Sequence, residues 1–258
     1  MQSHQRRMAE SSAADPERYD RTRPRYPDEL VQAVIAHSPG RVVLDVGCGT
    51  GVVARQFQAA GCQVLGVDVD ERMADYARRT GVAVEVSSFE QWDPDGRRCD
   101  AVVAGQTWHW VDPIAGAAKA AEVLRPGGRL AVFWNVFLPP PHVARALTEA
   151  HASAVPTSPF AAGATSGFDG YILLSTMATD GIRQVGAFTD PVEWRFDWQR
   201  DYTRDEWLEQ LRNSGEAGRL TPEELEKLLA ATGAALDGLG GTVTMPYATM
   251  TVTATRHP

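Results

Sequence analysis

The run Val42-Val43-Leu44-Asp45-Val46-Gly47-Cys48-Gly49-Thr50-Gly51 decides the fold class of this chain. Its apolar, β-branched start is typical of a buried parallel strand, and the glycines that follow predict a tight turn. A second apolar run, Val64-Leu65-Gly66-Val67-Asp68, ends in an acid. Glycines at alternate positions let the backbone approach a ligand, and Asp68 is placed to accept hydrogen bonds from two ribose hydroxyls. The two runs predict a nucleoside cofactor across the ends of two neighbouring parallel strands.

The acid before the first glycine separates two kinds of cofactor. The dinucleotide fingerprint G-x-G-x-x-G holds a pyrophosphate at a helix N-terminus, whereas this chain reads Asp-x-Gly-x-Gly-x-Gly from Asp45 to Gly51. A carboxylate beside a pyrophosphate is unfavourable, because like charges repel in a partly buried site. A zwitterionic amino acid that carries a sulfonium is attracted instead. The pattern favours a sulfonium nucleoside over a nicotinamide or flavin dinucleotide, and a purely structural glycine turn is the third alternative.

Length and charge set limits on the class of protein. The chain has 258 residues, of which 43% are hydrophobic, so it can bury one substantial core, and one α/β domain with insertions is expected. Acidic residues outnumber basic ones by 33 to 25, which gives a net charge of −8. Binding to a phosphate backbone is driven by Lys and Arg, so a nucleic-acid partner is disfavoured. The short pairs such as Arg78-Arg79 and Arg97-Arg98 are interpreted as surface charge.

Targeting and metal signals are weak throughout the sequence. Cys48, Cys62 and Cys99 lack metal-ligand spacing and cannot all pair, which predicts reduced cysteines and no metal. Residues 1–15 are polar and are predicted to be disordered, and Met1–Ala14 has no apolar core of a signal peptide. No apolar run approaches the roughly 20 residues that span a bilayer. We therefore expect a soluble, cytoplasmic protein without a membrane partner, and the sequence leaves its oligomeric state open.

Strands and helices alternate over the first half of the chain, which implies right-handed crossovers and a parallel sheet. The predicted strands are Arg41–Val46, Gln63–Val67, Val82–Val86, Asp100–Ala104 and Arg129–Asn135. The predicted helices are Asp28–His37, a helix from Val52 that ends at Gly61, Glu71–Thr80 and Asp112–Leu124.

The pattern changes after Asn135. Three prolines at 139–141 break the chain, and Pro156–Gly170 is rich in Gly, Ser, Thr and Pro. A long loop inside a compact domain is often functional, so residues 136–182 are interpreted as an insertion that covers the active site. Val192–Gln199 and Thr242–Arg256 are predicted strands. Thr203 to Glu206 and Thr221 to Glu224 fit two capping boxes, each opening a helix.

Motifs along most of the chain resemble those of the class I S-adenosylmethionine-dependent methyltransferases. The Asp45–Gly51 run resembles motif I of that family, and Asp68 resembles the acid that ends its second strand. Tyr19 with Arg23-Pro24-Arg25-Tyr26-Pro27 looks like the RP-x-YP signature of a small-molecule branch that includes the trans-aconitate and cantharidin methyltransferases. Gln106-Thr-Trp-His109-Trp110 and Pro126-Gly127-Gly128 are similar to segments around the family's fourth and fifth strands.

The resemblance implies a Rossmann-like α/β fold with seven strands in the order 3-2-1-4-5-7-6, the seventh antiparallel, and a helical cap. It implies one methyltransferase domain over residues 16–258, S-adenosyl-L-methionine as cofactor, S-adenosyl-L-homocysteine as product, and a small-molecule acceptor. An alternative is a protein of this fold that binds the cofactor but performs other chemistry, such as cyclisation.

The resemblance also implies cofactor-binding residues, which are Tyr19, Arg23, Asp45, Gly47, Cys48, Gly49, Gly51, Asp68, Val69, Met73, Ser88, Phe89, Glu90 and Gln106. Asp45 is expected near the methionine amino group, and Val69 and Met73 beside the adenine. Ser88 stands where the family often has Asp, which puts that adenine contact in doubt. For Tyr19 and Arg23, the alternative is that they are ordinary surface residues.

His109 is the histidine best placed for catalysis, because it follows the fourth strand between Trp108 and Trp110. A base is needed when the acceptor is a hydroxyl, an amine or a carbon acid, but not for an ionised carboxylate. The alternative, which the sequence supports equally, is that His109 is a packed, hydrogen-bonded residue that only lines the site. Trp194, Trp198 and Trp207 line either an acceptor pocket or the core.

Overall fold

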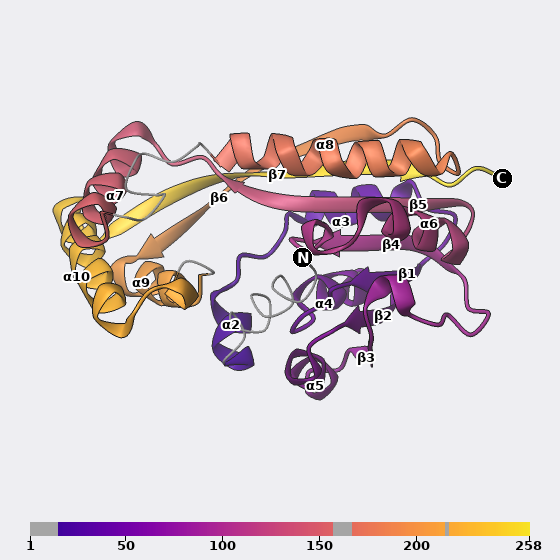
Figure 1. The fold of residues 1–258 in the computed structure, drawn as a ribbon, viewed down its shortest axis with the longest axis horizontal. Helices are drawn as coiled ribbons and strands as arrows, with labels where there is room; N and C mark the ends of the chain where they lie inside the picture. Colours follow the sequence, from indigo (N-terminus) through magenta and orange to yellow (C-terminus); the bar gives the residue numbers. More distant parts are fainter. Residues whose placement is uncertain (1–14, 157–166, 215–216) are drawn as a thin grey trace. The chain divides into compact units, whose positions relative to one another are not determined.

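The computed structural model describes residues 15–156, 167–214 and 217–258 (Figure 1). The disorder predicted for residues 1–15 therefore lies, apart from Asp15, outside the described residues, as does most of the Pro156–Gly170 stretch. Asp15 itself accepts a hydrogen bond from the Arg18 amide at 3.0 Å and caps a helix that the sequence analysis did not predict.

The bounds of the secondary structure follow the predicted alternation closely. The strands are β1 Val42–Val46, β2 Gln63–Asp68, β3 Ala83–Val86, β4 Cys99–Gly105, β5 Leu124–Phe137, β6 Val192–Thr203 and β7 Thr242–Thr255. The α-helices are α2 Pro16–Thr22, α3 Asp28–Ala36, α4 Val52–Ala59, α5 Glu71–Arg79, α6 Pro113–Val123, α7 Pro141–Ala154, α8 Gly167–Val185, α9 Arg204–Arg212 and α10 Pro222–Gly238. The short 3-10 helices are η1 Phe89–Gln91, η2 Trp108–Trp110 and η4 Ala217–Arg219.

The seven strands form one sheet in the order β3-β2-β1-β4-β5-β7-β6, which confirms the predicted order. The pairs β1–β2, β1–β4, β2–β3 and β4–β5 are parallel. β7 runs the other way. The backbone of Gly127 bonds to Arg256, the Thr253 hydroxyl bonds to the Leu130 carbonyl, and Leu138 bonds to Pro246. In and next to β5 the residue numbers rise from 127 to 138, while those of the bonded residues in and next to β7 fall from 256 to 246. β7 is therefore antiparallel to β5.

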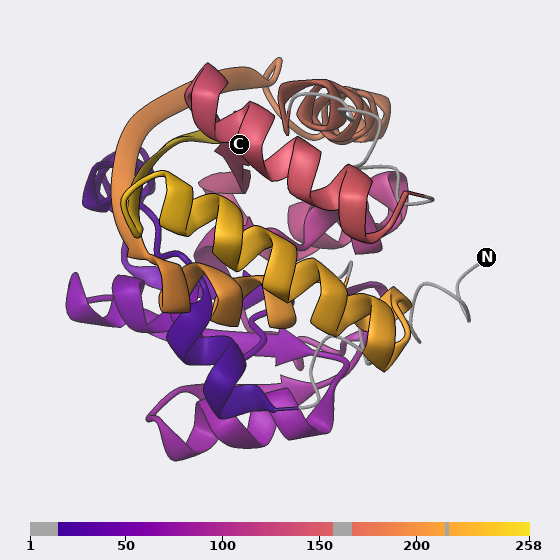
Figure 2. The same ribbon diagram turned by 90° about the vertical axis from the view of Figure 1, so that its left-hand side faces the viewer.

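The chain divides into two compact units, and each has its own core. The sheet unit comprises Pro24–Asn135, Tyr171–Phe196 and Thr249–Pro258, and the helical unit comprises Met1–Arg23, Val136–Gly170 and Asp197–Ala248. In the sheet unit, alternate strand residues such as Val43, Val103 and Phe133 pack with α3 and α4. In the helical unit, residues of α7 and α10 pack with the ends of β6 and β7, and Figure 2 shows α7 beside α10.

Two local signals in the sequence are confirmed at atomic detail. Thr203 and Thr221 each accept a hydrogen bond from the amide three residues on, and Glu206 and Glu224 each accept one from the cap residue's amide, so both capping boxes form. The fifth strand, however, runs from Leu124 to Phe137, so it begins five residues before the predicted Arg129–Asn135 and ends two residues after it. The extension includes Pro126 and Gly127, which the local pattern assigns to a turn. The boundaries predicted for a single domain with a cap at 136–182 stay a prediction.

Candidate functional site

The glycine run after β1 forms a tight loop against the end of β2. The amides of Gly47 and Cys48 both donate to the Val67 carbonyl, at 2.7 and 3.2 Å. Gly47 has a φ of +62°, and a Cβ there would lie 2.0 Å from Cγ2 of Thr107, so only glycine fits. At Gly49, by contrast, a Cβ would meet no described atom within 4 Å. One side of the loop is therefore open to a ligand.

Asp68 ends β2 beside this open side. One carboxylate oxygen accepts from the Gly49 amide at 2.7 Å, and the other accepts from the Asp70 amide at 2.8 Å. Burial raises the pKa of Asp68, and these amides oppose the shift. A carboxylate offers about four lone-pair sites. The two hydrogen bonds therefore fix its orientation and leave acceptor capacity for hydroxyl groups.

Asp45 is a second buried acid, and its side chain is only 1% exposed. Neither oxygen makes a hydrogen bond of normal geometry with a described residue. Burial is the main cause that raises the pKa of Asp45 to about 8; the nearby Ala54 amide opposes this shift, and the Asp68 charge adds to it. Because Ala54 lies in the first turn of α4, the carboxyl sits at a helix N-terminus. That is the position in which a dinucleotide-binding fold holds its pyrophosphate.

The ends of β3 and β4 lie at the same edge of the sheet. The Ser87 amide donates to the Asp68 carbonyl at 2.9 Å, which places Ser88, Phe89 and Glu90 next to β2. Phe89 is buried, and Glu90 accepts a hydrogen bond from the Asp112 amide at 3.0 Å. The Glu90 carboxylate thus has a structural partner at the start of α6.

Gln106, the residue after β4, has a φ of +55°. A non-glycine residue in this region is strained, and such strain is often found at functional sites. The Gln106 amide donates to the Phe133 carbonyl at 2.8 Å, and its side-chain amide donates to the Asn135 carbonyl at 3.2 Å. The ends of β4 and β5 are joined by these two contacts.

His109 lies in η2, within a cluster of aromatic rings. The indole N–H of the buried Trp134 donates to His109 Nδ1 at 3.3 Å. The Trp110 ring lies on another side, with its centroid 4.8 Å from the imidazole. Burial lowers the pKa of His109 to about 4, so the imidazole is neutral at neutral pH.

The structure gathers most of the predicted site residues at one edge of the sheet unit. The exceptions are Tyr19 and Arg23, which belong to the helical unit, where the Arg23 guanidinium lies over the Tyr19 ring at 4.3 Å. Cys48 is buried, and its Sγ would lie 2.5 Å from a Cβ on Gly66, so it packs onto β2. Met73 is buried in α5. The roles of these residues toward a cofactor stay predictions.

Sequence reasoning missed three residues that shape this edge. Trp134 holds His109, and Asn135 bonds Thr249 through its Oδ1 at 2.6 Å. Tyr26 packs edge-on against Phe133 with centroids 4.7 Å apart, and its hydroxyl closes the space over Gly105. A signal was available for Trp134, because a tryptophan in a buried strand needs a partner for its N–H.

The three tryptophans offered as pocket or core residues lie in aromatic contacts. Trp194 packs against the core of the sheet unit and lies under the Arg129 guanidinium. In the helical unit, Trp198 stacks on Tyr247 at 4.2 Å, and Trp207 meets Tyr202 edge-on at 5.2 Å. These contacts favour the core interpretation for all three.

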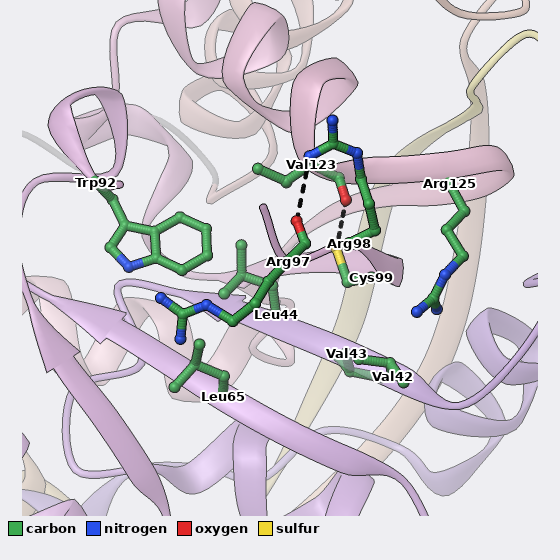
Figure 3. A pocket seen from close by; sticks show the side chains of 10 residues that line it. All are labelled: Val42, Val43, Leu44, Leu65, Trp92, Arg97, Arg98, Cys99, Val123 and Arg125. Carbon is green, nitrogen blue, oxygen red and sulfur yellow. Dashed lines mark hydrogen bonds between the residues drawn. The ribbon is translucent and has the colours of Figure 1, made fainter. Parts of the chain in front are cut away.

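A cavity of about 290 Å³ lies elsewhere in the sheet unit (Figure 3). Its lining comes from the start of β1, from the start of β4 and from the end of α6, and consists of Val42, Val43, Leu44, Leu65, Trp92, Arg97, Arg98, Cys99, Val123 and Arg125. Parallel strands β1 and β4 begin here, whereas the glycine loop follows the end of β1. The cavity is therefore separate from the candidate site.

Other features of the described residues bear on the sequence predictions. All three cysteines are unpaired and buried. Among the residues that the structure describes, no three His, Cys, Asp or Glu side chains lie together as a metal site. None of the described helices is long and apolar enough to cross a membrane.

Comparison with known proteins identifies the class of fold. A family model described as a methyltransferase domain matches residues 43–128, which include the glycine loop, Asp68 and His109. A putative type II methyltransferase from Anaeromyxobacter dehalogenans has the same fold, with a TM-score of 0.64 and 21% identity over 92% of this chain and 99% of that one. Residues 43–128 therefore resemble a methyltransferase domain, and the chain shares the fold of that methyltransferase.

Two curated relatives each match less than half of this chain. An uncharacterized methyltransferase of Mycobacterium tuberculosis is 38% identical over 119 residues, covering 45% of this chain and 49% of that protein. A ribosomal RNA small subunit methyltransferase C of Chromohalobacter salexigens is 34% identical over 123 residues, covering 44% of this chain and 37% of that protein. The chain thus spans about half the length, or less, of these relatives.

Proposed function

We propose that this protein transfers a methyl group from S-adenosyl-L-methionine to a small-molecule acceptor. The position of Asp45 carries the proposal. Its carboxyl occupies the N-terminus of α4, near the Ala54 amide, and has no hydrogen bond of normal geometry within the described chain. A cationic ligand would stabilise the ionised form of this buried carboxyl and lower its pKa, whereas a pyrophosphate would oppose its ionisation. This position of Asp45 supports a sulfonium amino acid over a nicotinamide or flavin dinucleotide.

The other residues of the edge fit the remaining parts of the same cofactor. Asp68 keeps acceptor capacity for two ribose hydroxyls beside the open side of Gly49. Val69 and Met73 are proposed to flank the adenine, with Ser88, Phe89 and Glu90 at its edge. Tyr19 and Arg23 are proposed to approach from the N-terminal segment. When bound, the cofactor supplies an already activated methyl group, so the protein mainly aligns the acceptor and excludes water.

The charges of the described residues favour a small acceptor over RNA. Arginine side chains on the surface form ion pairs with neighbouring acids, for example Arg78 with Asp75, Arg97 with Glu85 and Arg183 with Asp190, at 2.6 to 2.7 Å. A face that binds a phosphate backbone needs arginines free to release counterions. These ion pairs support a small-molecule acceptor, although one relative is named as a ribosomal RNA methyltransferase.

The test is turnover with a labelled methyl group. The purified protein is incubated with S-adenosyl-L-methionine and with separate carboxylate, phenol and amine acceptors, and S-adenosyl-L-homocysteine release is measured. Acceptor-dependent release together with label in the acceptor is the expected result. Binding of the cofactor with product chemistry other than methyl transfer would favour the alternative, a cyclase-like or binding role. Binding of a nicotinamide dinucleotide in its place would contradict the proposal outright.

A further inference from the structure

The side chains of Trp134 and Trp110 both contact the His109 ring, and the two contacts differ in kind. The Trp134 indole N–H donates to Nδ1 at 3.3 Å, whereas the contact recorded for Trp110 is between rings, with centroids 4.8 Å apart. An indole nitrogen donates a hydrogen bond and never accepts one. His109 Nδ1 must therefore present its lone pair to Trp134. In a neutral imidazole the single hydrogen then resides on Nε2.

We propose that Trp134 is a positioning residue that fixes His109 as a neutral hydrogen-bond donor through Nε2–H. This inference rests on the proposed function, because it assigns to His109 a role toward the methyl acceptor. With Nδ1 engaged and Nε2 protonated, the ring has no free lone pair with which to take a proton. His109 therefore holds the acceptor by donating a hydrogen bond, and it moves no proton from it.

Neighbouring elements keep Trp134 in this orientation. Trp134 is 3% exposed in β5, and its ring lies edge-on to Tyr171 of α8, with centroids 5.9 Å apart. The Tyr171 hydroxyl in turn donates to Glu193 of β6 at 2.7 Å. The indole is thus held by packing from one side while its N–H points to His109. An indole fixed in this way specifies one tautomer of the imidazole.

Protonation of His109 is opposed by the same geometry. An imidazolium carries hydrogen on both nitrogens, so Nδ1–H would face the indole N–H and the hydrogen bond would be lost. The lowered pKa of His109, which burial causes without a contribution from any described charge, acts in the same direction. A general base at neutral pH works best with a pKa near 7, which this ring does not have.

Nuclear magnetic resonance of the ¹⁵N-labelled protein tests the proposal directly. Long-range ¹H–¹⁵N spectra report which ring nitrogen carries hydrogen, and the His109 signals are those that vanish in His109→Gln. We expect hydrogen on Nε2 alone from pH 6 to pH 8. Trp134→Phe keeps an aromatic ring but removes the donor, so the proton affinity of His109 should rise roughly three- to tenfold. Hydrogen on Nδ1 in the wild type would overturn the proposal.

Trp110→Phe is the matched control, because it makes the same substitution on the neighbour that gives no hydrogen bond. Its His109 titration should stay at the wild-type position. An equal rise in both variants, or no rise in Trp134→Phe, would also overturn the proposal. If Trp134→Phe does not fold, the Trp134 indole N–H signal of the wild-type protein provides the test. Its hydrogen should exchange slowly with water, and its chemical shift should change in His109→Gln. An unchanged chemical shift would overturn the proposal. None of these measurements uses cofactor or turnover, so they fail independently of the proposed function.

Discussion

At the scale of single residues, Asp45 combines burial with the lack of a normal hydrogen bond, and this has a measurable cost. Its pKa is about 8 in the folded chain and about 4 when unfolded. The folded state then binds more protons between these values, so the free energy of unfolding falls as pH rises from about 4 to 8. Asp45→Asn removes this loss and should stabilise the ligand-free protein by roughly 1–3 kcal/mol above pH 8. The gain should shrink toward pH 4.

Thermal unfolding of both proteins between pH 4 and pH 9 measures this gain. Asp100 provides the control, because it is also buried but accepts hydrogen bonds from the Val42 amide at 2.9 Å and from Arg125 at 2.7 Å. Asp100→Asn should therefore lose stability at neutral pH. A lower melting temperature for Asp45→Asn at pH 9 would show that the carboxylate has a partner that compensates its burial.

Asp68 tests the cofactor site itself. Removing its carboxylate in Asp68→Ala should weaken binding of S-adenosyl-L-homocysteine by about 1.5–3 kcal/mol, the usual contribution of hydrogen bonds to a charged group. Calorimetric titration measures the affinity, and Asp70→Ala is the comparison because Asp70 bonds chiefly to Arg72 outside the loop. Equal affinities for wild type and Asp68→Ala would place the cofactor elsewhere.

If His109 acts as a hydrogen-bond donor, His109→Gln and His109→Ala should lower kcat to different extents. Glutamine can donate a hydrogen bond but cannot act as a base, so His109→Gln should keep kcat within about tenfold of wild type. His109→Ala should lose more through poorer positioning. A base would lose roughly 10²–10⁴ in kcat in both variants. Single-turnover rates from pH 6 to pH 9 distinguish these outcomes, and an equal loss in both variants would favour the base.

The site was predictable from the sequence only where a strand end fixes a residue. Asp45, the glycines and Asp68 follow apolar runs, so their meeting at one edge follows from a parallel sheet. Trp134 was not predicted as a partner of His109, because the two are 25 residues apart and meet only once β4 and β5 pair. The same holds for Asn135 and Thr249, which β5 and β7 bring together.

At the scale of elements, the loop between β1 and α4 depends on Gly47 for two reasons. Its φ is +62°, and an added Cβ would lie 2.0 Å from Thr107 Cγ2. Gly47→Ala should therefore cost about 2–4 kcal/mol of stability, the sum of backbone strain and overpacking. Gly81→Ala should cause backbone strain alone. Gly81 has a φ of +93°, but a Cβ added there would meet no described atom within 4 Å. Its cost should be about 1–2 kcal/mol. Equal costs in chemical denaturation would contradict the steric contact.

The two helices whose starts carry capping boxes were predicted, whereas α2 was missed although Asp15 caps its start. Thr203 and Thr221 open helices because their hydroxyls satisfy free amides, a local effect that needs no tertiary contact. Beyond the Asp15 cap, the contacts that stabilise α2 come from residues far along the chain. Thr22 accepts a hydrogen bond from Asn213 at 3.2 Å, and Arg21 pairs with Glu209. The partners in these contacts are about 190 residues apart in the sequence, so the hydrophobic periodicity of a seven-residue helix cannot predict them.

At the scale of the whole molecule, the charge of the chain supports the proposed small acceptor over RNA. The net charge is −8, and arginines over much of the described surface are paired with acids, including Arg204 with Asp237 and Arg212 with Glu226. Each such pair adds little stability, but together they remove positive potential from the surface. Association with a polyanion should then be weak and should show a shallow dependence on salt.

Filter binding of a labelled ribosomal RNA fragment at several salt concentrations measures this property. We expect dissociation constants no tighter than about 10⁻⁴ M at physiological salt, at the weak end of non-specific binding, because few phosphates are neutralised. Under the same conditions, labelled methyl groups should enter a small acceptor and not the RNA. Methyl incorporation into RNA, or a steep fall of affinity with salt, would show that the described arginine pairs open on binding. The acceptor site would then have to be assigned to a nucleic-acid substrate.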